Sequence, residues 1–151
     1  MIGLNYLGKL GQLGNQMFQY AALKGIAAKH NYKTIIPNHN ELIVDALGNK
    51  LRIELFDAFD IPCGPMDVGY VPDNRDLHEP HYHFSQELLD KCPDNVSLVG
   101  YFQSEKYFKH IEDDIRNLFA PKKESKECYE EVKELFDNPV ALHIRRGDFL
   151  I

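Results

Sequence analysis

The first 37 residues combine, in this order, a short alternation of apolar residues, a series of glycines, a helical period and a second apolar run. Apolar residues occupy every second position from residue 2 to residue 6, which is the pattern of a β-strand. Gly8, Gly11 and Gly14 follow and predict a tight loop. A strand, a glycine loop, a helix and a second strand form the unit from which open, mostly parallel α/β sheets are built.

The helix of this unit begins after Gly14. From there an apolar stripe recurs at helical spacing as far as Ile26. Asn15 stands where an N-cap residue is expected, and Asn31 stands near the expected C-cap. Residues 33–37 then predict the second strand.

After residue 37 the sequence predicts few regular elements as far as residue 89 and several more from residue 96 onwards. Residues 38–89 contain turn pairs and several prolines, so we expect long, irregular surface loops there. Later patterns predict a strand over 96–101, a helix capped by Ser104 and extending to residue 119, an amphipathic helix over 124–136 and a last strand over 140–145.

Length and composition are those of an ordinary globular domain. The chain has 151 residues, of which 44% are hydrophobic and 26% are charged. This composition excludes a disordered or collagen-like chain. A chain of this length buries roughly 70% of the surface that its unfolded form exposes, which suffices for one core and not for two full domains.

The charge balance argues against nucleic acid as a partner. The chain has 17 lysines and arginines against 23 aspartates and glutamates, so its formal net charge is −6. A nucleic-acid-binding domain usually carries a basic surface, and we therefore expect no such partner. Two of the five arginines, Arg145 and Arg146, are nevertheless adjacent.

The cysteines and the lengths of the apolar runs indicate which cellular compartment to expect for this protein. Cys63, Cys92 and Cys128 are odd in number and widely separated, without the paired spacing of a metal site, so we expect reduced thiols. No run approaches 18 consecutive apolar residues, and the N-terminus lacks the pattern of a signal peptide. We expect a soluble, cytoplasmic protein, or one that is peripheral at a membrane.

The glycine segment GQLGNQMFQYA, residues 11–21, is the first candidate site. Glycines between a strand and a helix let the backbone approach a ligand closely, and the helix N-terminus offers unpaired N–H groups. The segment is neither a dinucleotide-binding fingerprint nor a Walker loop, because it lacks the spacing of the first and the Gly-Lys-Ser/Thr ending of the second. A tight connection that binds nothing explains these residues equally well.

The segment HIRRGDF, residues 143–149, is the second candidate site. On a strand, His143 and Arg145 point to the same side, and Arg146 leaves the strand at its carboxyl end, where open α/β sheets bind ligands. Arginine suits bidentate phosphate recognition, so the pair could stabilise a departing diphosphate without a metal. The alternatives are a solvated basic pair bonded to Asp148, or an Arg-Gly-Asp adhesion tripeptide.

The segment LHEPHYHF is the third candidate site. His78, His81 and His83, with Glu79 among them, could bind zinc. Pro80 interrupts any helix there, and no other cluster completes a coordination shell. We therefore expect no metal site and a polar loop that lines a cleft.

Three segments together resemble a known family. Residues 11–21, 100–108 and 143–149, with the sequences GQLGNQMFQYA, GYFQSEKYF and HIRRGDF, are similar in order and spacing to segments of the bacterial and viral α-1,2-fucosyltransferases of glycosyltransferase family 11. LHEPHYHF resembles the aromatic, His-containing stretch that precedes the second segment in that family. The likeness corresponds to the N-terminal part of the family.

This resemblance implies a GT-B architecture, in which two Rossmann-like domains face each other across a cleft. Residues 1–138 would form the acceptor-side Rossmann-like domain, and residues 139–151 the first strand and donor-binding motif of a truncated second domain. The implied reaction is inverting transfer of L-fucose from GDP-fucose to a galactoside hydroxyl, with no metal and no other cofactor. We expect the remaining part of the second domain to be missing from this chain or supplied by a partner chain.

The resemblance also assigns residue roles. His143, Arg145, Arg146 and Asp148 would bind the donor, and Arg145 and Arg146 would act catalytically by stabilising the departing GDP. The residues expected to line the cleft are Gly14, Asn15, Gln16, Glu79, His81 and His83. The last three are candidates for the general base.

Three functional interpretations follow. The chain is a fucosyltransferase or the N-terminal piece of one, a non-catalytic sugar- or nucleotide-binding module related to it, or an α/β protein in which the motifs serve packing alone. The sequence does not identify the acceptor, the linkage or the base.

Overall fold

The computed structural model describes residues 1–44, 48, 50–73 and 75–135. The chain divides into two compact units, Met1–Ala120 and Pro121–Ile151. The predicted boundary at residues 138 and 139, the predicted strand over 140–145 and the whole HIRRGDF segment lie outside the described residues.

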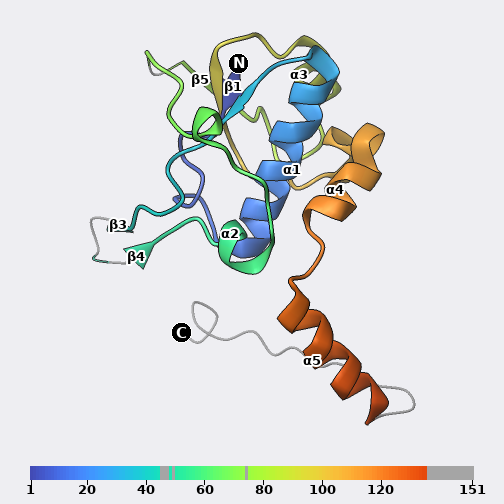
Figure 1. The fold of residues 1–151 in the computed structure, drawn as a ribbon. Coiled ribbons are helices and arrows are strands. Elements are labelled where there is room, and N and C mark those ends of the chain that lie inside the picture. Colours follow the sequence, from blue (N-terminus) through green and yellow to red (C-terminus); the bar gives the residue numbers. More distant parts are fainter. Residues whose placement is uncertain (45–47, 49, 74, 136–151) are drawn as a thin grey trace, which may run out of the picture. The chain divides into compact units, whose positions relative to one another are not determined.

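The first unit contains a four-stranded parallel sheet in the order β2-β1-β6-β5 (Figure 1). Its strands are β1 (Ile2–Gly3), β2 (Thr34–Ile35), β5 (Asp76–His78) and β6 (Val96–Val99). Ile2 is paired with Thr34 on one side and with Val96 on the other, both in parallel register. The open parallel sheet confirms the predicted Rossmann-like α/β class.

Strand β1 is shorter than the alternation predicts. The side chain of Asn5 forms two hydrogen bonds with the backbone of Val71, at 3.0 Å to its carbonyl oxygen and 2.9 Å from its N–H. These bonds tie the chain after β1 to a loop that is distant in sequence, so the segment leaves the strand early.

Helix α1 (Leu13–His30) packs on the sheet and contributes much of the core. The predicted C-cap is confirmed, because Asn31 adopts the left-handed conformation with φ 55°. The predicted N-cap is wrong. The helix begins before Asn15, with Gln12 at the N-cap, and the N–H of Leu13 donates to Glu54 Oε2 at 2.7 Å. A carboxylate from a distant segment thus satisfies the helix N-terminus.

The predicted helix from Ser104 to residue 119 is also wrong in its first half. Ser104 caps a short 3₁₀ turn, η2 (Glu105–Tyr107), which is followed by a second turn, η3 (Lys109–Ile111), and then by helix α4 (Glu112–Leu118). Tyr107 is fully buried, and Phe108 has the non-helical angles φ −132° and ψ 10°. Burial of Tyr107 overrides the local helical period here.

The middle of the chain is more ordered than expected. Besides β5 it contains a hairpin of β3 (Ile43–Val44) and β4 (Lys50–Leu51), helix α2 (Leu55–Ala58), the turn η1 (Pro65–Asp67) and helix α3 (Gln86–Lys91). The N-cap of α3 is Ser85, whose Oγ accepts from the N–H of Leu88 at 3.1 Å. These elements were missed because each is only two to six residues long, too short to show a periodic pattern.

The described part of the second unit is helix α5 (Lys123–Glu134), which agrees with the amphipathic helix predicted over 124–136.

All three cysteines are free thiols, and burial raises the pKa of Cys92 to about 11. Among the described residues, no helix is both long and apolar enough to cross a membrane.

Candidate functional site at the carboxyl edge of the sheet

The carboxyl ends of the parallel strands meet at one edge of the sheet, which is where open α/β sheets bind ligands. Strand β5 ends at His78, β6 ends at Val99, and the glycine loop after β1 passes beside them. A cavity of about 380 Å³ lies at this edge. Its lining residues come from three segments and are Leu10, His78, Glu79, Pro80, His81, Tyr82, Val99, Gly100 and Tyr101.

Glu79 stands in the wall of this carboxyl-edge cavity and is half-buried. Its N–H continues the pairing of β5 with β6 by donating to Val99 O at 2.8 Å. Its Oε2 accepts two backbone hydrogen bonds, from Tyr101 N at 3.0 Å and from Phe102 N at 2.9 Å. The carboxylate therefore joins the end of β5 to the turn after β6.

The three histidines of LHEPHYHF occupy different positions. His78 and His81 line the cavity, while His83 is exposed and outside its lining. His81 Nδ1 lies 2.9 Å from His83 O, and the two imidazole rings are 5.8 Å apart. Within the residues that the structure describes, no three metal-binding side chains gather closely enough to hold an ion.

The residues expected from the glycine segment lie away from this lining. Gly14 is exposed, and a Cβ there would meet no atom within 4 Å. Asn15 Oδ1 accepts from Gln103 Nε2 at 2.7 Å. Gln16 is 1% exposed, and its amide bonds Arg52 O at 3.0 Å and Glu54 N at 2.7 Å. Gln16 is thus an internal brace that holds the loop before α2 against α1.

Gln19 is a site residue that the sequence analysis missed. It is 2% exposed, and its Nε2 donates to Leu10 O and to Gly100 O, each at 3.0 Å. Both acceptors belong to residues that line the cavity. The spacing of Gln16 and Gln19 within an apolar helical run is the one sequence signal that could have indicated buried amides.

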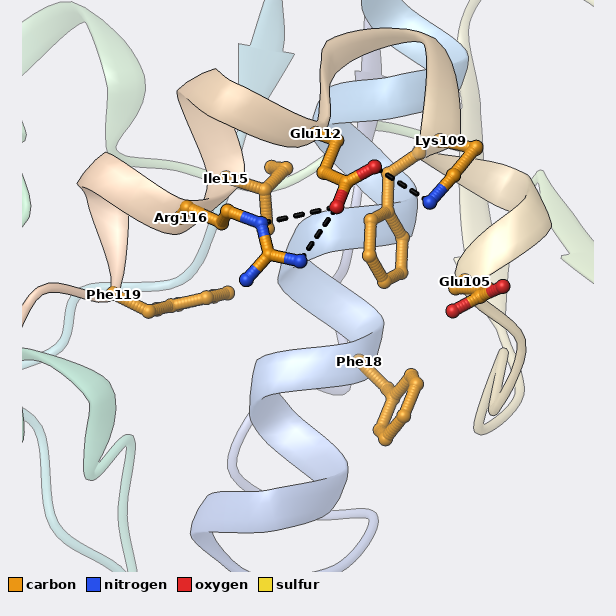
Figure 2. A pocket seen from close by; sticks show the side chains of 8 residues that line it. Phe18, Glu105, Lys109, Glu112, Ile115, Arg116 and Phe119 are labelled. Atoms are coloured by element: carbon orange, nitrogen blue, oxygen red, sulfur yellow. Dashed lines mark hydrogen bonds and ion pairs between the residues drawn. The ribbon is translucent and has the colours of Figure 1, made fainter.

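A second cavity, of about 480 Å³, lies between α1 and the segment from η2 to α4 (Figure 2). Its apolar wall includes Phe18 and Phe119, and Glu112 bridges Lys109 and Arg116, each at 2.6 Å. These two cations lower the pKa of Glu112 to about 2. A second carboxylate, Glu105, also lines the cavity, so its two cations and two carboxylates carry no net charge.

The carboxyl-edge cavity has the more suitable chemistry for a small polar ligand. Its volume falls in the range of about 300–1,000 Å³ that is typical of small-molecule sites. Among the described residues, its lining combines a carboxylate and two imidazoles with the rings of Tyr82 and Tyr101, and none of these lining residues is a lysine or arginine. Such a surface offers donors, acceptors and aromatic faces to a neutral, hydroxyl-rich molecule.

Comparison with known proteins places the chain among glycosyltransferases. It is 30% identical over 150 residues to a galactoside 2-alpha-L-fucosyltransferase of Caenorhabditis elegans, covering 92% of this chain and 36% of that protein. It is 26% identical to an alpha-1,2-colitosyltransferase of Escherichia coli, with 93% and 53% covered. It is 29% identical to galactoside alpha-(1,2)-fucosyltransferase 1 of Ateles belzebuth, with 93% and 38% covered.

The chain therefore spans about a third to a half of the length of these relatives. No solved structure matches it. The family model described as glycosyl transferase family 11 matches residues 2–151, almost the whole chain. By this match, and in agreement with its three motifs and its parallel α/β sheet, the chain belongs to glycosyl transferase family 11.

Proposed function

We propose that this chain is the acceptor-side part of an α-1,2-fucosyltransferase, which transfers L-fucose from GDP-fucose to a galactoside hydroxyl with inversion. Membership of the family and the names of two relatives support the reaction. The observation that carries the acceptor role is the carboxyl-edge cavity, whose lining, as far as the structure describes it, combines Glu79, imidazoles and tyrosines without a lysine or arginine. A neutral galactoside matches that lining better than an anionic nucleotide does.

In this proposal the two substrates are bound by different parts of the chain. The galactoside occupies the carboxyl-edge cavity, and His143, Arg145, Arg146 and Asp148 bind GDP-fucose. As the bond between fucose and GDP breaks, Arg145 and Arg146 stabilise the negative charge that develops on the diphosphate. A carboxylate or imidazole takes the proton of the attacking hydroxyl. No metal is required for these steps.

A non-catalytic sugar-binding module is the second candidate. The carboxyl-edge cavity supports it, because hydrogen-bonding groups and aromatic faces bind a sugar whether or not transfer follows. A turnover assay with GDP-fucose and lactose distinguishes the two. Formation of fucosyl-lactose supports the enzyme, and binding of lactose without release of GDP supports the module.

Lactose is expected to bind the 151-residue chain at the carboxyl-edge cavity. In an NMR titration, the backbone amides of Glu79 and Tyr101 should shift, because the sugar would replace water beside them. Tyr82→Ala should weaken binding several-fold by removing an exposed aromatic face from the cavity wall. Tyr70→Ala removes another exposed tyrosine, outside that wall, and should leave affinity unchanged. Absence of shifts at millimolar lactose would contradict the acceptor role.

GDP is expected to bind through Arg145, whose guanidinium suits bidentate contact with a diphosphate. Calorimetry on the wild-type chain should detect GDP binding, and Arg145→Ala should abolish it. Arg75→Ala removes an exposed arginine of the first unit and serves as the matched control for lost charge. Equal affinities of the wild type and Arg145→Ala would remove Arg145 from the donor site.

A further inference from the structure

We propose that Glu79 is a positioning residue of the acceptor cavity, which holds the backbone of residues 100–102 in its binding geometry through Oε2. This inference rests on the acceptor role proposed above. It removes Oε2 of this carboxylate from the candidates for the general base.

Two side chains hold three consecutive backbone groups of the turn after β6. Gln19 Nε2, from α1, donates to Gly100 O at 3.0 Å. Glu79 Oε2, from the end of β5, accepts from Tyr101 N at 3.0 Å and from Phe102 N at 2.9 Å. Tyr101 lines the cavity, so these bonds define where its ring and its backbone face a ligand.

The turn needs such support because its backbone is strained. Phe102 has φ 52°, in the left-handed region that bulky side chains rarely adopt, and this conformation costs about 1 kcal/mol or more. Its side chain is fully buried, with its ring 5.6 Å from that of Tyr107. The carboxylate helps to hold this turn by accepting hydrogen bonds from the N–H groups of Tyr101 and Phe102.

Close packing of the two chain segments makes these bonds possible. A Cβ added to Gly100 would lie 2.5 Å from Glu79 Cβ, closer than two such atoms can approach. Glycine at this position therefore lets the end of β5 come near enough for the carboxylate to reach the turn. Glu79 N is itself bonded to Val99 O, which holds the backbone of Glu79 beside the end of β6.

The same bonds commit Oε2 to the turn. An oxygen that accepts two hydrogen bonds from the turn has both of its lone pairs occupied and does not face an attacking hydroxyl. A general base must also reach the hydroxyl that it deprotonates. A positioning role, in contrast, needs only an oxygen acceptor at this point, and a glutamine side chain supplies one without being a base.

Three variants test this assignment in the full 151-residue chain. Glu79→Gln keeps an oxygen that accepts hydrogen bonds, Glu79→Met keeps the size of the side chain without that oxygen, and Glu79→Ala removes both. We expect Glu79→Gln to bind lactose within about threefold of the wild type, and the other two variants to bind at least tenfold more weakly. Hydrogen exchange at the amides of Tyr101 and Phe102 should accelerate in the methionine and alanine variants and stay slow in the glutamine variant.

The outcomes separate this inference from the proposed function. Normal lactose affinity and slow exchange at both amides in Glu79→Met would overturn the positioning role. Failure of the wild type to bind lactose would refute the acceptor role, whereas the exchange pattern would still test whether Glu79 holds the turn. If the chain turns over substrate, Glu79→Gln should keep most of its kcat, and a loss of about 10²–10⁴-fold would instead identify a general base.

Discussion

Replacing Tyr107 by alanine should destabilise the chain by about 3–5 kcal/mol, the largest stability effect that we expect from a single substitution. Tyr107 is fully buried, and its ring centroid lies 4.9 Å from that of Phe84 and 5.6 Å from that of Phe102. Its hydroxyl accepts from the N–H of Ser85 at 3.0 Å. Truncation would leave a cavity and a buried donor without a partner. Urea unfolding followed by circular dichroism measures the effect.

Tyr107→Phe separates packing from hydrogen bonding. It keeps the ring, leaves Ser85 N–H unpaired and should cost about 1–3 kcal/mol of folding stability.

Burial also raises the pKa of Tyr107 above its ordinary value of about 10. The stability due to the neutral hydroxyl is therefore fully present below pH 10 and is lost as pH rises through the folded-state pKa. The alkaline loss should be smaller in Tyr107→Phe. A cost below 1 kcal/mol for Tyr107→Ala would contradict the burial of this side chain.

Gly25→Ala should destabilise the chain by about 1–3 kcal/mol, although alanine is the better helix former. The crossing of α1 and η2 leaves no room for a side chain there. A Cβ at Gly25 would lie 2.2 Å from Tyr107 O and 2.8 Å from Phe108 Cα, and both of these are backbone atoms that cannot rotate away. Thermal or urea unfolding of the variant tests the crossing directly.

Gly14→Ala is the matched control in the same helix. Gly14 is exposed, and a Cβ there meets nothing within 4 Å, so alanine should be neutral or stabilise by up to about 1 kcal/mol. Opposite signs for the two substitutions would confirm that packing, and not helix propensity, decides the effect at Gly25. Stabilisation by Gly25→Ala would mean that α1 and η2 do not approach this closely.

The elements with strong local periodicity could be predicted from the sequence. Helix α1, its cap at Asn31 and strand β6 agree with the predictions, because the period of the apolar residues depends only on neighbours along the chain. The start of α1 could not be predicted, since the group that satisfies Leu13 N–H belongs to Glu54, 41 residues away. The break at Phe108 has the same origin, because burial of Tyr107 against distant segments interrupts a regular helical pattern.

The candidate site was predictable in part. Glu79 and His81 were expected in a cleft and line the carboxyl-edge cavity, whereas Gln16 is an interior brace and His83 lies outside the lining. Gln19 was not anticipated, because its acceptors, Leu10 O and Gly100 O, are 9 and 81 residues away. The donor-side arginines stay a prediction from the motif.

The sequence by itself determined the order of the main elements, the parallel α/β class and, through three motifs taken together, the family. Only the tertiary structure decided which polar side chains face the cavity and which ones brace its walls. Glu79 illustrates the reason. Hydrogen bonds are short and directional, so the role of a carboxylate depends on the groups that folding brings within about 3 Å of it. Its two partners here lie 22 and 23 residues further along the chain.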